Sequence, residues 1–412
     1  MTCSTTRRRF LKQTLGSSVL VAAGGPWVPE FLLHSARAAA GRSTDRVLVV
    51  VQLSGGNDGL NTVVPYRDPL YRQARPTLAV PSAQVLKLEN GLGLHPSLQG
   101  LEELWQDGSL CVVQGVGYPN PNRSHFRSMD IWHSAQPENP KPRTGWLGRW
   151  LDRQGGQAAQ LAALHLGQEP LPLALAARSV AVPSFASLEG FRLHEHDAAL
   201  STAALRQLAL AQHSPQQPTP LEAFVRRQML AALDASSRVS QALQEEAAGT
   251  DYPPNALARK LRNIAGLIDA GLPTRIYYVS LAGFDTHVKQ QGAHASLLRQ
   301  WGDALRAFAQ DLKARGHWQR VAVLTFSEFG RRVRENASAG TDHGTAAPVF
   351  LAGGKLRAGL HGPAPDLQDL EAGDLKFHTD FRCVYAAVLE HWLETPAAEV
   401  LGRQFPPVKV FQ

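Results

Sequence analysis

Three short apolar runs place the strongest constraint on the fold of this chain. They span Val47–Leu53, Arg275–Leu281 and Val321–Phe326, and each is rich in β-branched or aromatic residues and ends in a polar turn. Runs of this length and composition are typical of strands buried on both faces of a parallel sheet. A stretch with apolar residues at helical spacing, Leu297–Leu312, lies between the second run and the third. The alternation predicts an α/β fold, a mainly parallel sheet with helices on both faces.

Acidic residues and histidines occur where these strands are expected to end. The candidates are Asp58 after the first run, Asp285 and His287 after the second, Glu328 directly after the third, and Asp342 and His343 just before a further apolar run at Pro348–Ala352. Because ligands bind at the carboxyl edge of such sheets, we expect these side chains to meet there. Carboxylates and imidazoles bind zinc or manganese, and magnesium or calcium where oxygen ligands predominate. The sequence therefore predicts a site for one or two divalent metal ions.

These residues also have purely structural interpretations. Asp58 lies in a turn rich in asparagine and glycine, where aspartate is common. Glu328 could pair with Arg331 or Arg332, and Asp342 could simply orient the histidine that follows it. The sequence alone leaves both interpretations open.

The first 38 residues form the pattern of a twin-arginine export signal. Arg7 and Arg8 precede a moderately apolar segment, Leu15–Ala23, and small residues follow at 36–40. The apolar segment is too short to span a bilayer, which takes about 20 residues. We therefore expect residues 1–38 to engage the twin-arginine translocation machinery and to bring the protein to the periplasm or beyond.

The composition of the chain after residue 38 argues against several classes of partner. Five basic residues and one acidic residue within 1–38 account for four of the formal net charge of +7. The rest of the sequence has no basic stripe with interleaved aromatic residues, so we do not expect nucleic acid as a partner. No apolar stretch is long enough for a transmembrane helix. Cys111 and Cys383 either form one disulfide or remain free thiols.

The length of the pattern predicts a single α/β domain over residues 39–412. Residues 150–250 interrupt the pattern, because they are rich in leucine and alanine and include a segment rich in proline and glutamine at 212–219. Thr219–Glu222 then combines a capping box with proline at the first helical position. We therefore expect a helical insertion around residues 190–250, at the periphery of the domain.

Seven motifs, in this order, resemble a known family. They are GGNDGLN at 55–61, HPSLQGLEELWQDG at 95–108, NRSHFRSMDIWHSA at 122–135, GFDTH at 283–287, SEFGR at 327–331, GTDHG at 340–344 and TDFRCVYAAVLEHWL at 379–393. Together they resemble the exported bacterial family catalogued as domain of unknown function 1501, over essentially the whole mature chain. That family is in turn similar to the alkaline phosphatase and sulfatase superfamily. The resemblance implies an alkaline-phosphatase-like fold with a metal site.

The superfamily resemblance also implies roles for individual residues. The residues that correspond to its metal ligands are Asp58, Asp285, His287 and His343. Glu328 stands where the superfamily has an Asp-His pair, and Pro119 stands where sulfatases carry their nucleophile. Ser124 is the nearest hydroxyl, at the expected start of a helix. It is either the nucleophile, close to a helix N-terminus that favours anions, or merely an N-cap residue.

Two functions of different classes follow from these observations. The first is an exported metal-dependent hydrolase of phosphate or sulfate esters, acting on a small molecule or a glycan. Ser124 would be its nucleophile, and the six acids and histidines after the strands would form its metal site. The second is a non-catalytic periplasmic or surface module of the same fold that binds a glycan or a partner protein.

Overall fold

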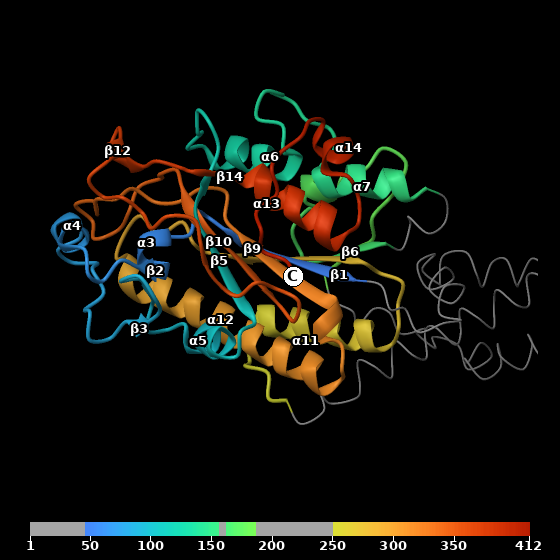
Figure 1. Cartoon of the computed structure of the whole chain (residues 1–412), viewed down its shortest axis with the longest axis horizontal. Coiled ribbons are helices and arrows are strands. Elements are labelled where there is room, and N and C mark those ends of the chain that lie inside the picture. Colours follow the sequence, from blue (N-terminus) through green and yellow to red (C-terminus); the bar gives the residue numbers. More distant parts are fainter. Residues whose placement is uncertain (1–45, 156–161, 187–249) are drawn as a thin grey trace, which may run out of the picture. The chain divides into compact units, whose positions relative to one another are not determined.

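The computed structural model describes residues 46–155, 162–186 and 250–412 (Figure 1). The predicted export signal at 1–38 lies outside these residues, and so does the predicted helical insertion up to residue 249. The chain divides into two compact units. Every helix and strand named below lies in the unit that comprises Thr44–Ser187, Glu246–Asp269 and Thr274–Gln412.

A nine-stranded sheet forms the centre of this unit, in the order β11-β5-β10-β9-β1-β8-β6-β7, with β14 pairing with β5. Its strands are β1 (Val47–Ser54), β5 (Leu110–Gly117), β6 (Ala163–Leu166), β7 (Ser184–Phe185), β8 (Ile276–Ala282), β9 (Val321–Phe326), β10 (Ala347–Gly353), β11 (Gly359–His361) and β14 (Thr379–Asp380). Only β10 runs antiparallel to its neighbours, β5 and β9. The sheet is therefore mainly parallel, as predicted.

The three runs that dominate the sequence form the adjacent strands β8, β1 and β9. Val50 of β1 lies opposite Tyr278 of β8 and Leu324 of β9. All three residues are at most 1% exposed, because the sheet is covered on both sides. Burial of each such side chain contributes about 1.5–3 kcal/mol relative to its exposure. The register brings the ends of β1, β8 and β9 to one edge of the sheet.

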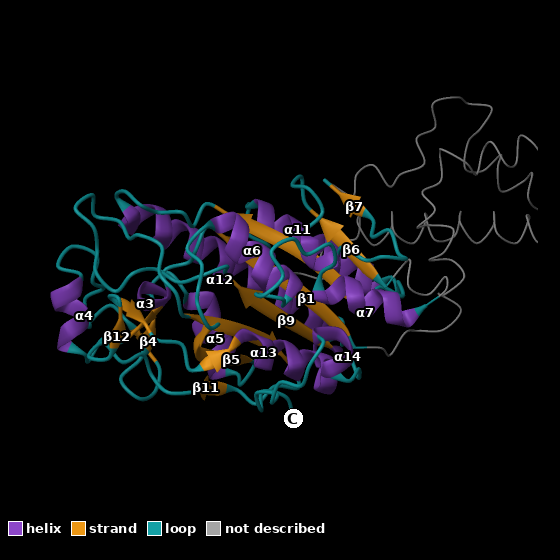
Figure 2. Ribbon diagram, turned by 90° about the horizontal axis from the view of Figure 1, so that it is seen from above, coloured by secondary structure: helices purple, strands orange, loops and turns teal. Residues whose placement is uncertain are grey.

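Helices cover both faces of the sheet (Figure 1). One face carries α6 (His125–Ser134), α7 (Trp146–Gln154), α13 (Phe381–Ala387) and α14 (Ala397–Leu401), and the other carries α5 (Gln99–Gln106), α11 (Ala256–Asp269) and α12 (Gln290–Ala314). Figure 2, seen from above, shows the strands running side by side from β6 through β1 and β9 to β5. The predicted α/β architecture is confirmed.

The remaining elements are short. They are the helices α3 (Gly59–Thr62) and α4 (Pro69–Ala74), the three-stranded sheet of β2 (Val63–Val64), β4 (Gly93–Leu94) and β3 (Leu86–Lys87), the hairpin of β12 (Leu370–Glu371) and β13 (Asp374–Leu375), the 3-10 turns η1 (Leu173–Leu175) and η4 (Trp318–Arg320), and the π-helical turn η5 (Val388–Trp392). Cys111 and Cys383 are unpaired. No helix among the described residues is long and apolar enough to cross a membrane.

Candidate metal centre

The loops after β1, β8 and β9 touch one another at the carboxyl edge of the sheet. Gly55, at φ +119°, allows this contact, because a Cβ atom there would lie 2.4 Å from the backbone nitrogen of Asp285. The Gly55 amide also donates to Glu328 Oε1 at 2.9 Å. On the other side, a Cβ atom on Gly340 would lie 2.0 Å from the carbonyl oxygen of His287. Glycine at these two positions thus lets the loops converge.

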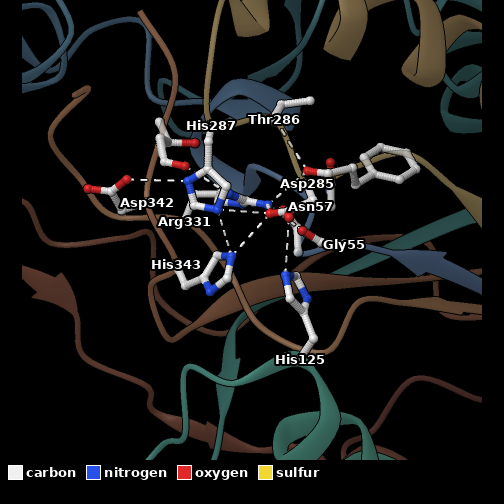
Figure 3. A network of polar contacts seen from close by, with 12 residues as sticks. Gly55, Asn57, His125, Asp285, Thr286, His287, Arg331, Asp342 and His343 are labelled. Atoms are coloured by element: carbon white, nitrogen blue, oxygen red, sulfur yellow. Dashed lines mark hydrogen bonds and ion pairs between the residues drawn. The ribbon is translucent and has the colours of Figure 1, made fainter. Parts of the chain in front are cut away.

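Three side-chain atoms at this edge form a tight triangle (Figure 3). His287 Nε2 lies 2.9 Å from His343 Nε2 and 3.0 Å from Asp285 Oδ1, and His343 Nε2 lies 3.1 Å from Asp285 Oδ1. His125 approaches from α6, with its Nε2 3.4 Å from Asp285 Oδ2. The carboxylate of Asp285 is therefore the common neighbour of three imidazoles.

The other ring nitrogen of each histidine is held by an acceptor. His343 Nδ1 lies 2.8 Å from the carbonyl oxygen of Arg123, which can only accept a hydrogen bond. His125 Nδ1 lies 2.9 Å from Glu328 Oε1, and His287 Nδ1 lies 3.3 Å from Asp342 Oδ1. When a ring is neutral, its Nδ1 therefore carries the hydrogen and its Nε2 is free to bind a metal ion, whereas a protonated ring donates from Nε2 to Asp285. Acceptors of this kind orient metal-binding histidines in proteins.

The three Nε2 atoms surround Asp285 as the ligands of one metal ion would. Ligands bound tetrahedrally to one zinc ion at about 2.0–2.2 Å are about 3.3–3.6 Å apart, so the triangle, with sides of 2.9–3.1 Å, would open by a few tenths of an ångström to hold an ion. Ligand atoms of His125, Asp285 and His343 all lie within 4.8 Å of one another. His125 Nε2 is buried and has no hydrogen-bond partner. The residues present thus fit a divalent ion held mainly by imidazole nitrogen.

Arg331 fixes the carboxylate at the centre of the site. Its buried guanidinium donates to Asp285 Oδ1 at 2.8 Å and to the carbonyl oxygens of Gly55, Gly56, Phe284 and Thr341. Partial burial raises the pKa of Asp285, but the hydrogen bonds from Arg331 and His343 and the charges of Arg331 and His287 together outweigh this effect, and the pKa lies at about 2. The pKa of His125 is raised, mainly by the hydrogen bond to Glu328, although partial burial acts in the opposite direction. Asp285 is therefore ionised at neutral pH, ready to bind a cation.

The site is open to solvent. The side chains of Asp285, His125 and His343 are 48%, 33% and 20% exposed. Asp285 and His125 border a shallow depression of about 400 Å³, whose other lining residues are Ser54, Gly55, Phe126, Met129 and Glu328. A small ester group can therefore reach the cluster directly from solvent.

The structure separates Asp58 from this cluster, although both lie at the same sheet edge. Asp58 is fully buried, where its Oδ2 accepts from Arg75 Nη1 and from Gln290 Nε2, each at 2.5 Å. Its Oδ1 accepts weakly from the amide of Asn61, at 3.4 Å, at the start of α3. The side chain of Asp58 is thus engaged by a guanidinium and an amide below the site.

Ser124 immediately precedes α6, at its N-cap position, and is exposed. No side chain, including its own, caps the helix through a hydrogen bond among the described residues. The Ser124 amide donates to Asn122 Oδ1 at 2.9 Å, while its hydroxyl has no protein partner in the described part of the chain. Ser124 directly precedes His125 in the chain, but it does not line the depression at the cluster.

Sequence reasoning identified Asp285, His287 and His343 but missed two residues of the site. His125 was recognisable only as part of the NRSHF motif, because the sequence does not reveal that α6 points its first residue at the edge of β1 and β8. Arg331 was expected only as a partner of Glu328, and it binds Asp285 instead. Glu328 and Asp342 each hold an imidazole ring, through His125 and His287.

Residues 45–379 match the sequence model of the family described as "Protein of unknown function (DUF1501)", which confirms the predicted family. No curated protein matches the chain. Solved structures that are similar to it include PsFucS1 sulfatase from Pseudoalteromonas sp., with 11% identity, coverage of 93% of this chain and 78% of that one, and a TM-score of 0.38.

Two further similar structures are the C-terminal periplasmic domain of EcEptC from Escherichia coli in complex with Zn and a protein in the alkaline phosphatase superfamily from Vibrio parahaemolyticus. The first has 10% identity, coverage of 76% of this chain and 74% of that one, and a TM-score of 0.37. The second has 9% identity, coverage of 82% and 71%, and a TM-score of 0.34.

Proposed function

Since the chain belongs to the DUF1501 family, whose description assigns no activity, we propose its function from the site: an exported hydrolase of phosphate or sulfate esters that depends on a divalent metal ion. The observation that carries the proposal is the convergence of three imidazole Nε2 atoms on Asp285, with every Nδ1 atom held by an acceptor. A ligand set dominated by imidazole favours zinc over magnesium or calcium.

The ligands in this proposal are Asp285, His287 and His343, with His125 completing the set. Glu328 and Asp342 act through the imidazole rings that they hold. A bound divalent ion would polarise the ester and lower the pKa of the attacking hydroxyl. Asp58, which the superfamily resemblance assigned to the metal, instead anchors the loop below the site.

The start of α6 supplies the remaining chemistry. Its first amides point away from the helix without a side-chain cap, and together with the helix dipole they attract an anion. A phosphate or sulfate group that reaches the cluster would accept hydrogen bonds from these amides. Ser124 offers its hydroxyl as the nucleophile at the same helix end. A metal site and an anion site thus share one helix terminus, through His125.

The test is a comparison of metal content and ester hydrolysis in the purified mature protein. We expect about one equivalent of zinc per chain by elemental analysis, with hydrolysis of 4-nitrophenyl phosphate or 4-nitrophenyl sulfate. His343→Ala should lose both the metal and the activity. Ser124→Ala should keep the metal and lose at least a hundredfold in kcat, whereas the matched exposed variant Ser296→Ala should keep both.

Each contrary result would contradict a different part of this proposal. A wild-type protein without bound metal would overturn the metal site. Bound metal without hydrolysis across a broad panel of phosphate and sulfate esters would favour the alternative, a non-catalytic module that binds a glycan or a partner protein. Unchanged turnover in Ser124→Ala would remove the serine from the mechanism and leave water as the nucleophile.

A further inference from the structure

A second cavity lies at the opposite end of α6 from the metal cluster. It has a volume of about 720 Å³, within the range of about 300–1,000 Å³ that is typical of small-molecule sites. Its walls come from the connection between α6 and α7, from α7 itself and from the segment after η1, and they comprise Gln136, Asn139, Lys141, Arg143, Thr144, Arg149, Ala177 and Arg178. The helix α6 has ten residues, a length of about 15 Å, so the two sites are separate.

The cavity concentrates positive charge. Four of its eight lining residues are basic, and none is acidic. Lys141, Arg143 and Arg178 are exposed, and within the described residues their side chains take part in no hydrogen bond or ion pair. The nearby carboxylate of Asp152 accepts from the backbone amides of Arg178 and Ser179 and from the Ser179 hydroxyl, and the charge of Arg178 helps to lower its pKa, so Asp152 offsets part of the charge of Arg178. The repulsion between like charges on one concave surface decreases when an anion binds between them.

The guanidinium of Arg149 is held in a fixed position at one side of this cavity. Its guanidinium donates to the carbonyl oxygens of Ser134, Thr144 and Val400, at 2.7, 3.1 and 2.6 Å. Burial lowers the pKa of Arg149 to about 10, and the charge of Arg178 acts in the same direction. Since no carboxylate pairs with Arg149 among the described residues, its charge also remains for a ligand.

The uncharged residues of the cavity favour a ligand with hydroxyl groups. Asn139 donates to Gln136 Oε1 at 3.1 Å, which orients both amides, and the side-chain amide nitrogen of Gln136 has no protein partner in the described part of the chain. Thr144 adds a hydroxyl. No aromatic residue lines the cavity, so it lacks the stacking surface that nucleic-acid bases use. Amides and a hydroxyl beside cations suit a sugar that carries an anionic group.

We propose that this cavity is a binding site for a sugar that carries a phosphate or sulfate group. Lys141, Arg143 and Arg178 bind the anionic group, and the amide of Gln136 binds sugar hydroxyls. The site does not depend on ester hydrolysis at the metal cluster. If the proposed hydrolase also acts on anionic glycans, one anionic group can bind here while another reaches the cluster.

Calorimetric titrations of the purified protein in low salt test the proposal, with glucose 6-phosphate, glucose 6-sulfate, unmodified glucose and inorganic phosphate as probes. We expect Arg143→Gln/Arg178→Gln to weaken the binding of at least one of the two anionic sugars at least tenfold. Lys87→Gln/Arg299→Gln removes the same charge from exposed positions elsewhere and should leave that affinity unchanged. His343→Ala, which addresses the metal cluster, should also leave it unchanged. Unmodified glucose should bind at least tenfold more weakly than that anionic sugar.

Three results would overturn the assignment. Equal affinities in the cavity variant and the wild type would show that the anion binds elsewhere. Loss of binding in His343→Ala alone would assign the sugar to the metal cluster. Inorganic phosphate that binds as tightly as glucose 6-phosphate and glucose 6-sulfate would show that the cavity does not recognise a sugar. The two anionic sugars, compared in the wild type, distinguish phosphate from sulfate.

Discussion

Glu328 should control metal affinity through His125, without binding the metal itself. Its side chain is 1% exposed and accepts from His125 Nδ1 and from the Gly55 amide, each at 2.9 Å. Loss of such a partner typically lowers metal affinity 10–100-fold. We expect this loss in Glu328→Ala, and a smaller one in Glu328→Gln, whose amide oxygen can still accept.

Competition with a chelator measures these affinities. The matched control is Glu169→Ala, because Glu169 lies 3.5 Å from His165 in a glutamate–histidine pair remote from the cluster. The control should keep the affinity of the wild type. Equal losses in the two variants would mean that metal affinity follows general stability, contrary to the role given to Glu328.

Asp58 should contribute stability in a way that depends on pH. Burial raises its pKa, but the charge and hydrogen bond of Arg75 outweigh burial, so the pKa lies below the usual 3.8. A carboxylate with a lowered pKa stabilises the fold fully above its unfolded pKa, and this stabilisation is lost as the pH falls through its folded pKa. Asp58→Asn leaves Arg75 without its counter-charge, which costs about 3–5 kcal/mol at pH 7.

Urea unfolding of the wild type and Asp58→Asn between pH 7 and pH 3 tests this prediction. The difference in unfolding free energy should be constant above about pH 5 and shrink below the usual pKa of 3.8, because the Asp58 carboxyl is protonated in the unfolded chain at a higher pH than in the folded protein. A difference that does not change with pH would show that Asp58 is not the titrating group.

At the scale of residues, the sequence predicts which side chains reach the sheet edge but not where they point. Asp285, His287 and His343 were expected there and form the cluster. Asp58 was expected in the same role, yet its carboxylate turns inward to Arg75. The buried Arg75, which directly follows α4 and lies 17 residues later in the chain, binds this carboxylate. No local sequence pattern predicts such an ion pair.

At the scale of elements, α12 should support the site through its first residue. Gln290 is fully buried, and its Oε1 accepts from the hydroxyls of Thr286 and Thr341, at 3.0 and 2.5 Å. These threonines adjoin His287 and Asp342, so one amide joins the two loops that carry the cluster. We expect Gln290→Met to weaken metal binding about tenfold, as for other outer partners of metal ligands.

A matched substitution on the same helix isolates this effect. The side chain of Gln300 makes one weak hydrogen bond among the described residues, to Ser296 Oγ at 3.4 Å, so Gln300→Met should leave metal affinity unchanged. Chelator competition and thermal unfolding should be measured on both variants. A lower melting temperature of Gln290→Met without any change in metal affinity would reduce Gln290 to a structural residue.

Strands and helices were more predictable than their arrangement. The runs at Val47, Arg275 and Val321 form β1, β8 and β9 within one residue of the predicted limits, because buried parallel strands require continuous apolar sequence. The sequence did not show that β10 enters antiparallel between β9 and β5. The loop after β5 was expected at the site because of Ser124, but nothing in the sequence assigned the neighbouring His125 to the cluster.

At the scale of the whole molecule, we propose export through residues 1–38. A receptor reads the paired guanidinium groups of a twin-arginine signal, and the positive charge alone does not replace them. Arg7→Lys/Arg8→Lys should therefore keep the protein in the cytoplasm, as cell fractionation would show. Lys12→Arg, which alters a basic residue outside the pair, is the control and should reach the periplasm. Normal export of the double variant would contradict this route.

Metal binding should stabilise the whole fold, because the ligands come from distant parts of the sequence. His125, Asp285 and His343 meet only when β5, β8 and the loop before β10 are in place, so the unfolded chain has no comparable site. A ligand that binds only the folded state adds about 2.7 kcal/mol when its free concentration is 100 times its Kd. Zinc should therefore raise the melting temperature of the metal-free protein in proportion to the logarithm of its concentration. His343→Ala should show no such rise, and an equal rise in both proteins would place the stabilising ion outside the cluster.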